Sequence, residues 1–230
     1  MPTSIAVEEI LIYLIVSLLL TGFAWKKKAL DGKGIALANA FGLASMYFGG
    51  IGIFSVLVFL FIATEAATRI SRARTKITHG QRTTFNIIGN AGPAMLLLSI
   101  GRVDGFFGAM SASLADTFSS EIGMTAKSSP VLITTLKTVS TGTDGGITVK
   151  GMTAALAGAV LISVLSYMYS GSIGLAAIIL SSGIIGTLVD SILGAIFERR
   201  GKMDNTAVNF IATLIGGIAA VAAMSLQPGL

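Results

Sequence analysis

The sequence predicts an all-α fold: a polytopic bundle of transmembrane helices with about eight spans, or seven in the alternative. Of the 230 residues, 53% are hydrophobic and 12% are charged, whereas soluble domains carry about 25% charged residues. Apolar runs close to the length of a spanning helix recur along the whole chain. This composition excludes a disordered chain, an ordinary cytosolic enzyme and a basic nucleic-acid-binding domain, so the expected partner is the lipid bilayer and not nucleic acid.

The eight expected spans follow one another closely, at residues 8–24, 34–49, 52–69, 84–101, 104–118, 151–169, 172–196 and 205–226. The first span is not a cleavable signal, because Glu8 and Glu9 precede it where a signal peptide has a basic region. The second and third spans are divided only by the run Gly49-Gly50-Ile51-Gly52. A tight turn there gives eight spans, and a kink in one long helix gives seven.

The basic residues favour the turn. With eight spans, 15 of the 16 Lys and Arg residues fall on one side of the membrane, and only Arg102 falls on the other. Since basic loops stay in the cytoplasm, we expect both termini to be extracytoplasmic and the loops 70–83 and 119–150 to be cytoplasmic. The chain is then one integral domain, 1–230, of the plasma membrane, with any active site facing the cytoplasm. A kink would instead place Lys26–Lys28 opposite the other basic residues.

The chain has no Cys and a single His, His79, which excludes disulfides, thiolate chemistry and His-based metal clusters. Acids inside membrane segments are costly and are therefore candidates for function. In a regular helix, Asp116 shares a face with Ser119 and Ser120, whereas Glu121 lies on the face of Thr117. The two acids would hold one ion only if the helix ended near Ser120. The alternative is a structural acid paired with Lys127 or Arg82.

A polar stretch rich in Thr and Gly follows in the 119–150 loop. Glycines let backbone N–H groups approach an anion, Thr hydroxyls donate hydrogen bonds, Lys supplies a point charge for phosphate, and Asp144 suits Mg²⁺. The candidates are Thr134, Thr135, Lys137, Gly142, Thr143, Asp144, Gly145, Gly146 and Thr148. No Walker A motif occurs. The alternative is a flexible, turn-rich loop.

Further polar residues recur at helical spacing. Gly186, Asp190 and Gly194 share one face, so the glycines allow close approach of a ligand or of another helix. Two polar stripes face the bundle or a wet cavity, and their members are Gln81 and Arg82 with Asn86 and Asn90, and Asp204 with Asn205 and Asn209. Hydrogen bonds that pack helices together are the alternative for both Asn pairs.

These motifs carry a resemblance to a known family. The sequence resembles the integral-membrane family of phytyl-phosphate kinase, of the vitamin E pathway, and its archaeal and bacterial relatives. The resemblance rests on five motifs in this order: Gly80-Gln81-Arg82 with Asn90, Ala115 to Gly123, Ile133-Thr134-Thr135 with Lys137, Gly142 to Thr148 with Gly151, and Asp190-Ser191 with Leu193-Gly194-Ala195. The pattern is also distantly similar to CTP-dependent phytol and dolichol kinases and to CDP-diacylglycerol synthase. Ser119 stands where many relatives have Ala.

The resemblance implies a CTP- and Mg²⁺-dependent kinase that converts an isoprenyl monophosphate, of the phytyl or geranylgeranyl type, to the diphosphate. It implies Mg²⁺ at Asp116, Asp144 and Asp190, with Glu121 as a further candidate. Phosphates are expected at Arg82, Lys137 and the Gly142–Thr148 backbone. The lipid phosphate or the nucleotide is expected at the polar residues Gln81, Asn86, Asn90, Ser119, Asp204, Asn205 and Asn209. The alternatives are a cytidylyltransferase that makes a CDP-lipid and, from another class, a transporter of a phosphorylated or lipid-linked substrate. An oligomer is compatible with either enzyme.

Overall fold

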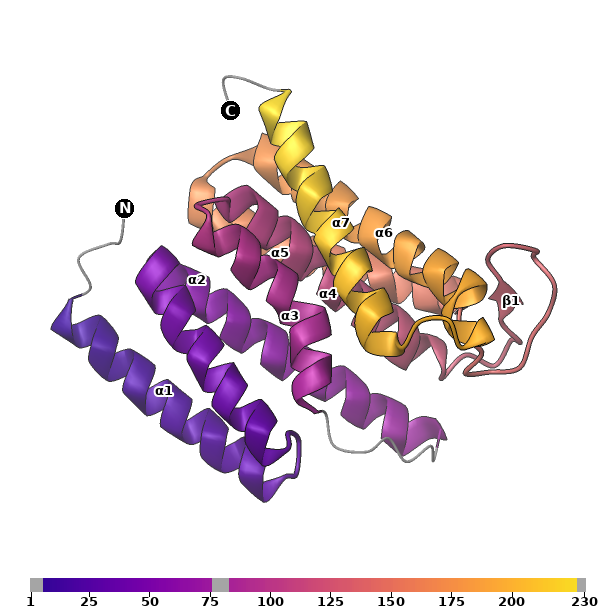
Figure 1. Ribbon diagram of the computed structural model, residues 1–230, viewed down its shortest axis with the longest axis horizontal. Coiled ribbons are helices and arrows are strands. Elements are labelled where there is room, and N and C mark those ends of the chain that lie inside the picture. The colour runs from indigo at the N-terminus through magenta and orange to yellow at the C-terminus, as the bar shows by residue number, and fades with distance from the viewer. Residues whose placement is uncertain (1–5, 76–82, 227–230) are drawn as a thin grey trace.

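The computed structural model describes residues 6–75 and 83–226 and confirms an all-α, polytopic membrane architecture. Within these ranges the helices are α1 (Val7–Lys26), α2 (Gly32–Thr75), α3 (Thr84–Ser99), α4 (Val103–Gly123), α5 (Val149–Ser170), α6 (Ile173–Ile196), the short 3₁₀-helix η1 (Glu198–Arg200) and α7 (Asn205–Ser225). The helices form one bundle, in which α1 lies at the edge beside α2 (Figure 1).

The long segment α2 reverses direction at Gly50. Its backbone there has φ 70° and ψ −169°, a left-handed conformation that glycine adopts without steric penalty. Figure 1 shows the two halves of α2 running back alongside each other from this point. A side chain at Gly49 would also collide with Ile53, so the turn depends on small residues. The predicted division between the second and third spans therefore coincides with a real reversal.

Helix α4 forms the centre of the bundle and packs against α2, α3, α5, α6 and α7. Glycines of the surrounding helices lie directly against its backbone or its alanines. A Cβ atom on Gly158 would come within 3.0 Å of the Leu114 carbonyl oxygen, and one on Gly216 would come within 3.2 Å of the Gly108 carbonyl oxygen. Such close contact is how small residues stabilise helix pairs in membranes. These contacts fix the position of α4 relative to the helices around it.

Five of the helices within the described ranges are long and apolar enough to cross a membrane: α1, α2, α5, α6 with η1, and α7. Helix α3 is shorter, at 16 residues. Helix α4 has 21 residues but is rich in small and polar side chains, which its neighbours shield from lipid. The hydrophobic runs thus predicted the outer helices more directly than the central one.

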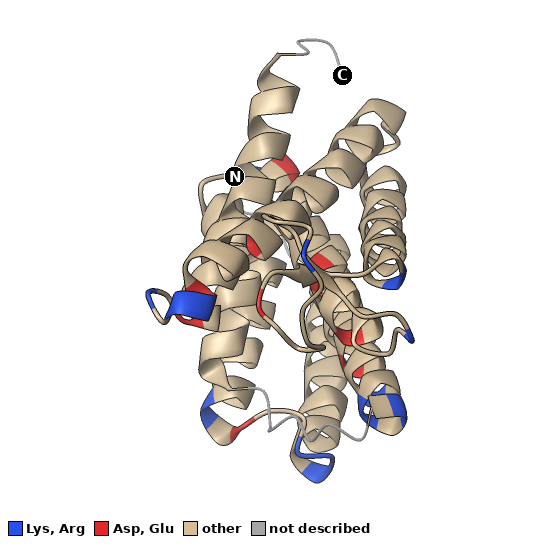
Figure 2. Cartoon of the chain, turned by 90° about the vertical axis from the view of Figure 1, so that its right-hand side faces the viewer, with Lys and Arg blue, Asp and Glu red and all other residues tan. Residues whose placement is uncertain are grey.

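The basic residues gather at one end of the bundle. We call this end, formed by Lys26–Lys28, the end of α2, the segment 124–148 and η1, the basic end. Helix α1 begins and α7 ends at the opposite end (Figure 1). Seen from the right-hand side of Figure 1, most Lys and Arg residues lie in the lower half or on outer loops, and several Asp and Glu residues lie nearer the middle (Figure 2). Arg102 lies at the opposite end, where its Nη2 atom is 2.6 Å from Asp104 Oδ2.

The segment predicted as the loop 119–150 is more ordered than expected. Helix α4 continues to Gly123, and a small antiparallel hairpin follows, in which β1 (Val131–Leu132) pairs with β2 (Gly146–Ile147). Helix α5 then begins at Val149, where the Thr148 hydroxyl accepts a hydrogen bond of 2.9 Å from the Gly151 N–H. The segment thus remains rich in turns, as the alternative expected, but a hairpin and two helix ends fix its path.

Candidate functional site

A polar cavity of about 460 Å³ lies at the basic end of the bundle. Its walls come from α2, α3, α4, α6, η1 and α7, and part of the segment 124–148 covers it. We call it the polar cavity. Segments distant in the sequence meet here because α4 contacts most of the other helices at the centre of the bundle.

Two carboxylates meet inside the polar cavity. Asp116 of α4 and Asp190 of α6 lie within hydrogen-bonding reach of each other, and the Oδ2 atom of Asp190 is buried without a hydrogen-bond partner among the described residues. Two adjacent negative charges repel each other unless a proton or a cation lies between them. The pair is therefore suited to a shared positive ligand. Gly186 and Gly194 do not line the cavity, because Gly186 packs against Ala112 and Gly194 against Gly145, so these two glycines follow the alternative of close packing.

Further acids surround this pair. Asp144 lies close enough to interact electrostatically with Asp190 and with Glu198 of η1, and Glu121 also lines the cavity. Arg72 is the one basic residue among the described lining residues. With five acids and one base among these described residues, the formal charge of the lining is negative, which favours a cation.

The predicted three-Asp metal set does not form a single tight cluster. Within the described ranges, no three Asp, Glu or His side chains converge as a preformed metal site. The structure joins Asp116 with Asp190 and leaves Asp144, on the loop, further from a common point. A magnesium ion commonly takes one or two carboxylates together with substrate phosphates and water, so the pair and the unpartnered Asp190 oxygen still fit such an ion.

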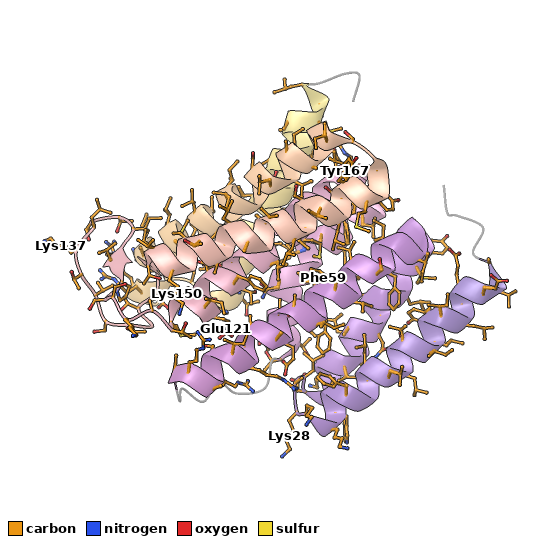
Figure 3. The ribbon with its side chains drawn as sticks, turned by 180° about the vertical axis from the view of Figure 1, so that it is seen from behind. Lys28, Phe59, Glu121, Lys137, Lys150 and Tyr167 are labelled. Carbon is orange, nitrogen blue, oxygen red and sulfur yellow. The ribbon has the colours of Figure 1, made fainter. Side chains whose placement is uncertain are left out.

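Glu121 and Asp116 lie on different faces of α4. Because α4 stays helical to Gly123, five residues separate the two side chains by about 140° around the helix. Glu121 is buried and accepts a hydrogen bond of 2.8 Å from the Thr68 hydroxyl of α2 (Figure 3). Its carboxylate thus lies on the α2 wall of the cavity.

The glycine-rich segment divides into two parts. Gly145, with φ 74°, packs so closely on Ala195 of α6 that a side chain would collide with the helix backbone. Gly142, with φ 86°, lines the cavity and has open space around its missing side chain. Gly145 therefore anchors the loop to α6, while the turn at Gly142 offers backbone to a ligand.

Thr143, Gly146 and Thr148 also line the cavity, but each has a structural contact. The Thr143 hydroxyl donates to the Ser140 carbonyl at 2.7 Å, and a Cβ atom on Gly146 would come within 2.9 Å of the Thr143 carbonyl. Thr148 is the N-cap of α5. The stretch from Thr141 to Asp144 is consequently the part of the loop that is most open to a ligand.

Lys137, Thr134 and Thr135 do not line the polar cavity. They are exposed in the turn of the hairpin, and Figure 3 shows Lys137 at its outer edge, away from the bundle. The turn is held by a hydrogen bond of 2.9 Å from the Leu132 N–H to the Lys137 carbonyl. The expectation that Lys137 meets a phosphate inside the cavity does not agree with this position, because pairing in the hairpin turns the residue outward.

The Asn residues form the opposite wall. Helices α3 and α7 approach closely, since a Cβ atom on Gly89 would come within 3.1 Å of the Thr206 carbonyl oxygen. This contact brings together four amides that line the cavity, Asn86, Asn90, Asn205 and Asn209. Asn86 accepts a hydrogen bond of 2.8 Å from the Thr83 N–H, and Asn90 accepts one of 3.2 Å from the Ser113 hydroxyl. These Asn side chains therefore both hold neighbouring segments together by hydrogen bonds and line the polar cavity.

Of the other predicted residues, Ser119 lines the cavity. Asp204 does not, because its carboxylate caps α7 by accepting a hydrogen bond of 2.8 Å from the Ala207 N–H. Gln81 and Arg82 lie outside the described residues.

Several lining residues were missed by the sequence analysis. Thr68 and Arg72 lie in α2, and Glu198 lies in η1. The spacing of Thr64, Thr68 and Arg72 by four residues places them on one helix face, a pattern that predicts a polar wall. Glu198 precedes two arginines, and nothing in its local sequence distinguishes it from a solvated loop acid.

Comparisons with known proteins agree with this architecture. The family described as Integral membrane protein DUF92 matches residues 15–217. A membrane protein of Methanocaldococcus jannaschii, described as uncharacterized, is 35% identical over 93% of this chain and 95% of its own length. Two Arabidopsis thaliana proteins are also similar: Protein PGR, 24% identical over 87% of this chain and 91% of its own length, and Protein VTE6, chloroplastic, 30% identical over 95% and 70%. No solved structure matches.

Proposed function

Because the chain belongs to the DUF92 family of integral membrane proteins, we propose that it is a CTP- and Mg²⁺-dependent isoprenyl-phosphate kinase. The observation that carries this proposal is the contact between Asp116 and Asp190 inside a cavity that also has an open glycine turn and an amide wall. The motif resemblance described above supports CTP and the isoprenoid. The similarity to Protein VTE6, chloroplastic, supports the family relationship.

The reaction is a single phosphoryl transfer. A phosphate oxygen of the isoprenyl monophosphate forms a bond to the γ-phosphorus of CTP, the bond from that phosphorus to the bridging oxygen breaks, and CDP leaves with that oxygen. Such transfers depend mainly on positioning and on neutralising charge. A magnesium ion would supply this neutralisation by binding phosphate oxygens. No protein nucleophile is required, because the acceptor is already an anion.

The residues of the cavity have distinct tasks in this proposal. Asp116 and Asp190 would hold the cation, and the carboxylates of Asp144 and Glu198 would add negative charge that favours its binding. The Thr141–Asp144 turn binds nucleotide phosphates through backbone N–H groups. Arg72 takes the role that the sequence analysis gave to Lys137, since it lines the cavity. The amides of α3 and α7 orient the acceptor phosphate.

We also propose that the polar cavity faces the cytoplasm and that the membrane is the plasma membrane. Among the residues that the structure describes, nearly all of the Lys and Arg side chains belong to the basic end, and loops rich in these residues remain in the cytoplasm. CTP is then available to the site, while the acceptor reaches it from the bilayer.

The test uses purified protein in nanodiscs, CTP labelled in the γ-phosphate, and geranylgeranyl phosphate. We expect label in the isoprenyl diphosphate together with an equal amount of CDP, and we expect chelation of Mg²⁺ to stop the reaction. Release of pyrophosphate with formation of a CDP-lipid would show a cytidylyltransferase instead. Uptake of an isoprenyl phosphate into vesicles without any chemical change would show a transporter.

A further inference from the structure

A second cavity, of about 150 Å³, lies between α1, both halves of α2, α3 and α4. We call it the apolar cavity. Its lining is mainly aliphatic and aromatic, and it includes Leu20, Ile35, Phe41, Leu57 and Phe61. A lining of this kind favours a hydrocarbon group over a polar one.

Asn39, the amide at the α1 side of its wall, is already bonded to the protein. The Asn39 Nδ2 atom donates to the Thr21 hydroxyl at 3.0 Å and to the Ile35 carbonyl at 2.9 Å. Tyr13 from α1 donates to the Asn39 carbonyl at 3.2 Å. These bonds leave little for a polar ligand to bind, so the occupant has to be apolar.

The two cavities adjoin each other. Asn86, Asn90 and Thr117 line both of them, so one molecule can place a charged head in the polar cavity and an apolar part in the other. The shared residues are polar and stand at the boundary. Such an arrangement fits an amphiphile with a phosphate head and a hydrocarbon tail.

We infer that the apolar cavity binds the isoprene unit next to the phosphate of the acceptor lipid, an inference that rests on the proposed kinase function. Cavities of about 150 Å³ lined by Leu, Ile and Phe accept a ligand the size of benzene, which is close to one branched five-carbon unit. The rest of the chain stays outside this cavity. The enzyme therefore selects the branched unit beside the phosphate and not the total chain length.

Ala38 gives the sharpest test, because it lines the apolar cavity and is half-buried. The variant Ala38→Leu fills the space, whereas Ala40→Leu adds the same bulk on the same helix half at an exposed position. A change of one methylene group in an apolar pocket alters substrate specificity by about 10- to 200-fold. We therefore expect Ala38→Leu to raise the KM for geranyl phosphate at least about tenfold. The KM for CTP stays the same, and Ala40→Leu behaves as the wild type.

Chain selectivity is measured with the wild type. Geranyl and geranylgeranyl phosphate should have similar kcat/KM values, and both should exceed that of straight-chain decyl phosphate. A decyl phosphate value equal to that of geranyl phosphate, or an unchanged geranyl phosphate KM in Ala38→Leu, would overturn the inference while leaving the kinase function in place.

A binding test does not need turnover. The chain has no Cys, so Ala38→Cys and Ala40→Cys each introduce a single thiol, which a small methanethiosulfonate reagent modifies. Farnesyl phosphate alone should slow modification of the first thiol and leave that of the second unchanged. If wild-type protein transfers no phosphate, the proposed function fails, but protection at position 38 still decides whether the cavity takes the chain. Equal rates with and without farnesyl phosphate at position 38 reject the inference.

Discussion

Asp116 and Asp190 reach each other across the interface between α4 and α6, although 74 positions separate them in the sequence. Their helices are held together by contacts of small residues, such as Gly186 against Ala112. Close packing thus brings two acids together that would repel each other in isolation. Binding of a cation between the two carboxylates would reduce their repulsion and so stabilise the folded protein.

We predict that Asp116→Asn and Asp190→Asn each lower kcat at least about 100-fold, since loss of residues that only support metal ligands already costs 10- to 100-fold. Asn keeps the size of the side chain but removes the charge that holds the cation. The measurement is CDP release at several Mg²⁺ concentrations. Asp31→Asn is the matched control, because Asp31 caps α2 through the Gly34 N–H and Asn preserves such a cap. Turnover of the Asp116 variant close to that of the control would reject the cation role.

The positions of two basic residues predict opposite results. Arg72 lines the polar cavity and Lys137 is exposed on the hairpin, so Arg72→Ala should weaken CTP binding about tenfold or more, the size of a lost charge-assisted hydrogen bond. Lys137→Ala should change it less than about twofold, within the small effect of an exposed charge. Titration of both variants with CTP and Mg²⁺ provides the comparison. A larger effect from Lys137 would mean that the hairpin folds over the nucleotide.

A comparison of Gly→Ala variants at positions 145 and 201 distinguishes the cost of backbone strain from the cost of a steric collision. Both have a positive φ, but a Cβ atom on Gly145 would collide with Ala195, while one on Gly201 meets nothing within 4 Å. Each Gly→Ala change costs about 1–2 kcal/mol from the left-handed backbone. We expect Gly145→Ala to lower the unfolding temperature in detergent clearly more than Gly201→Ala does. Equal shifts would show that the loop does not pack on α6.

Topology is tested by adding single cysteines to a chain that has none. Ser128→Cys and Lys202→Cys place thiols at the basic end, and Ser99→Cys and Ser170→Cys place them at the opposite end, all at exposed positions. We expect a membrane-impermeant maleimide added to intact cells to label only the second pair. Labelling of Ser128→Cys from outside would reverse the proposed orientation.

The sequence predicted the membrane class, the outer helices and the turn at Gly50, because each follows from local composition. It also identified Asp116, Asp190 and the Asn residues, since polar side chains in apolar runs are conspicuous. The sequence did not predict the positions of residues that depend on how loops and helices pack in the folded chain. Lys137 points outward because its turn is closed by pairing of Val131 with Thr138 and by the bond from the Leu132 N–H to the Lys137 carbonyl, a short contact that no periodicity reveals.

Glu198 and Gly145 illustrate the same limit in another way. The position of Glu198 depends on the short 3₁₀ turn after α6, and its local sequence is typical of an ordinary charged loop. Gly145 was predicted to bring its backbone to a phosphate, but its open side is occupied by α6. Glycine marks a place of close approach, and only the tertiary structure shows which partner approaches.

The central place of α4 has a consequence for the biogenesis of the protein. This helix is not among those apolar enough to cross a membrane by their own composition, and a weakly apolar segment partitions poorly from the translocon into lipid. Three of its packing partners, α5, α6 and α7, are synthesised after it. Stable integration of α4 therefore has to wait for the C-terminal third of the chain, and nascent chains that stop before α5 should be substrates for membrane quality-control proteases.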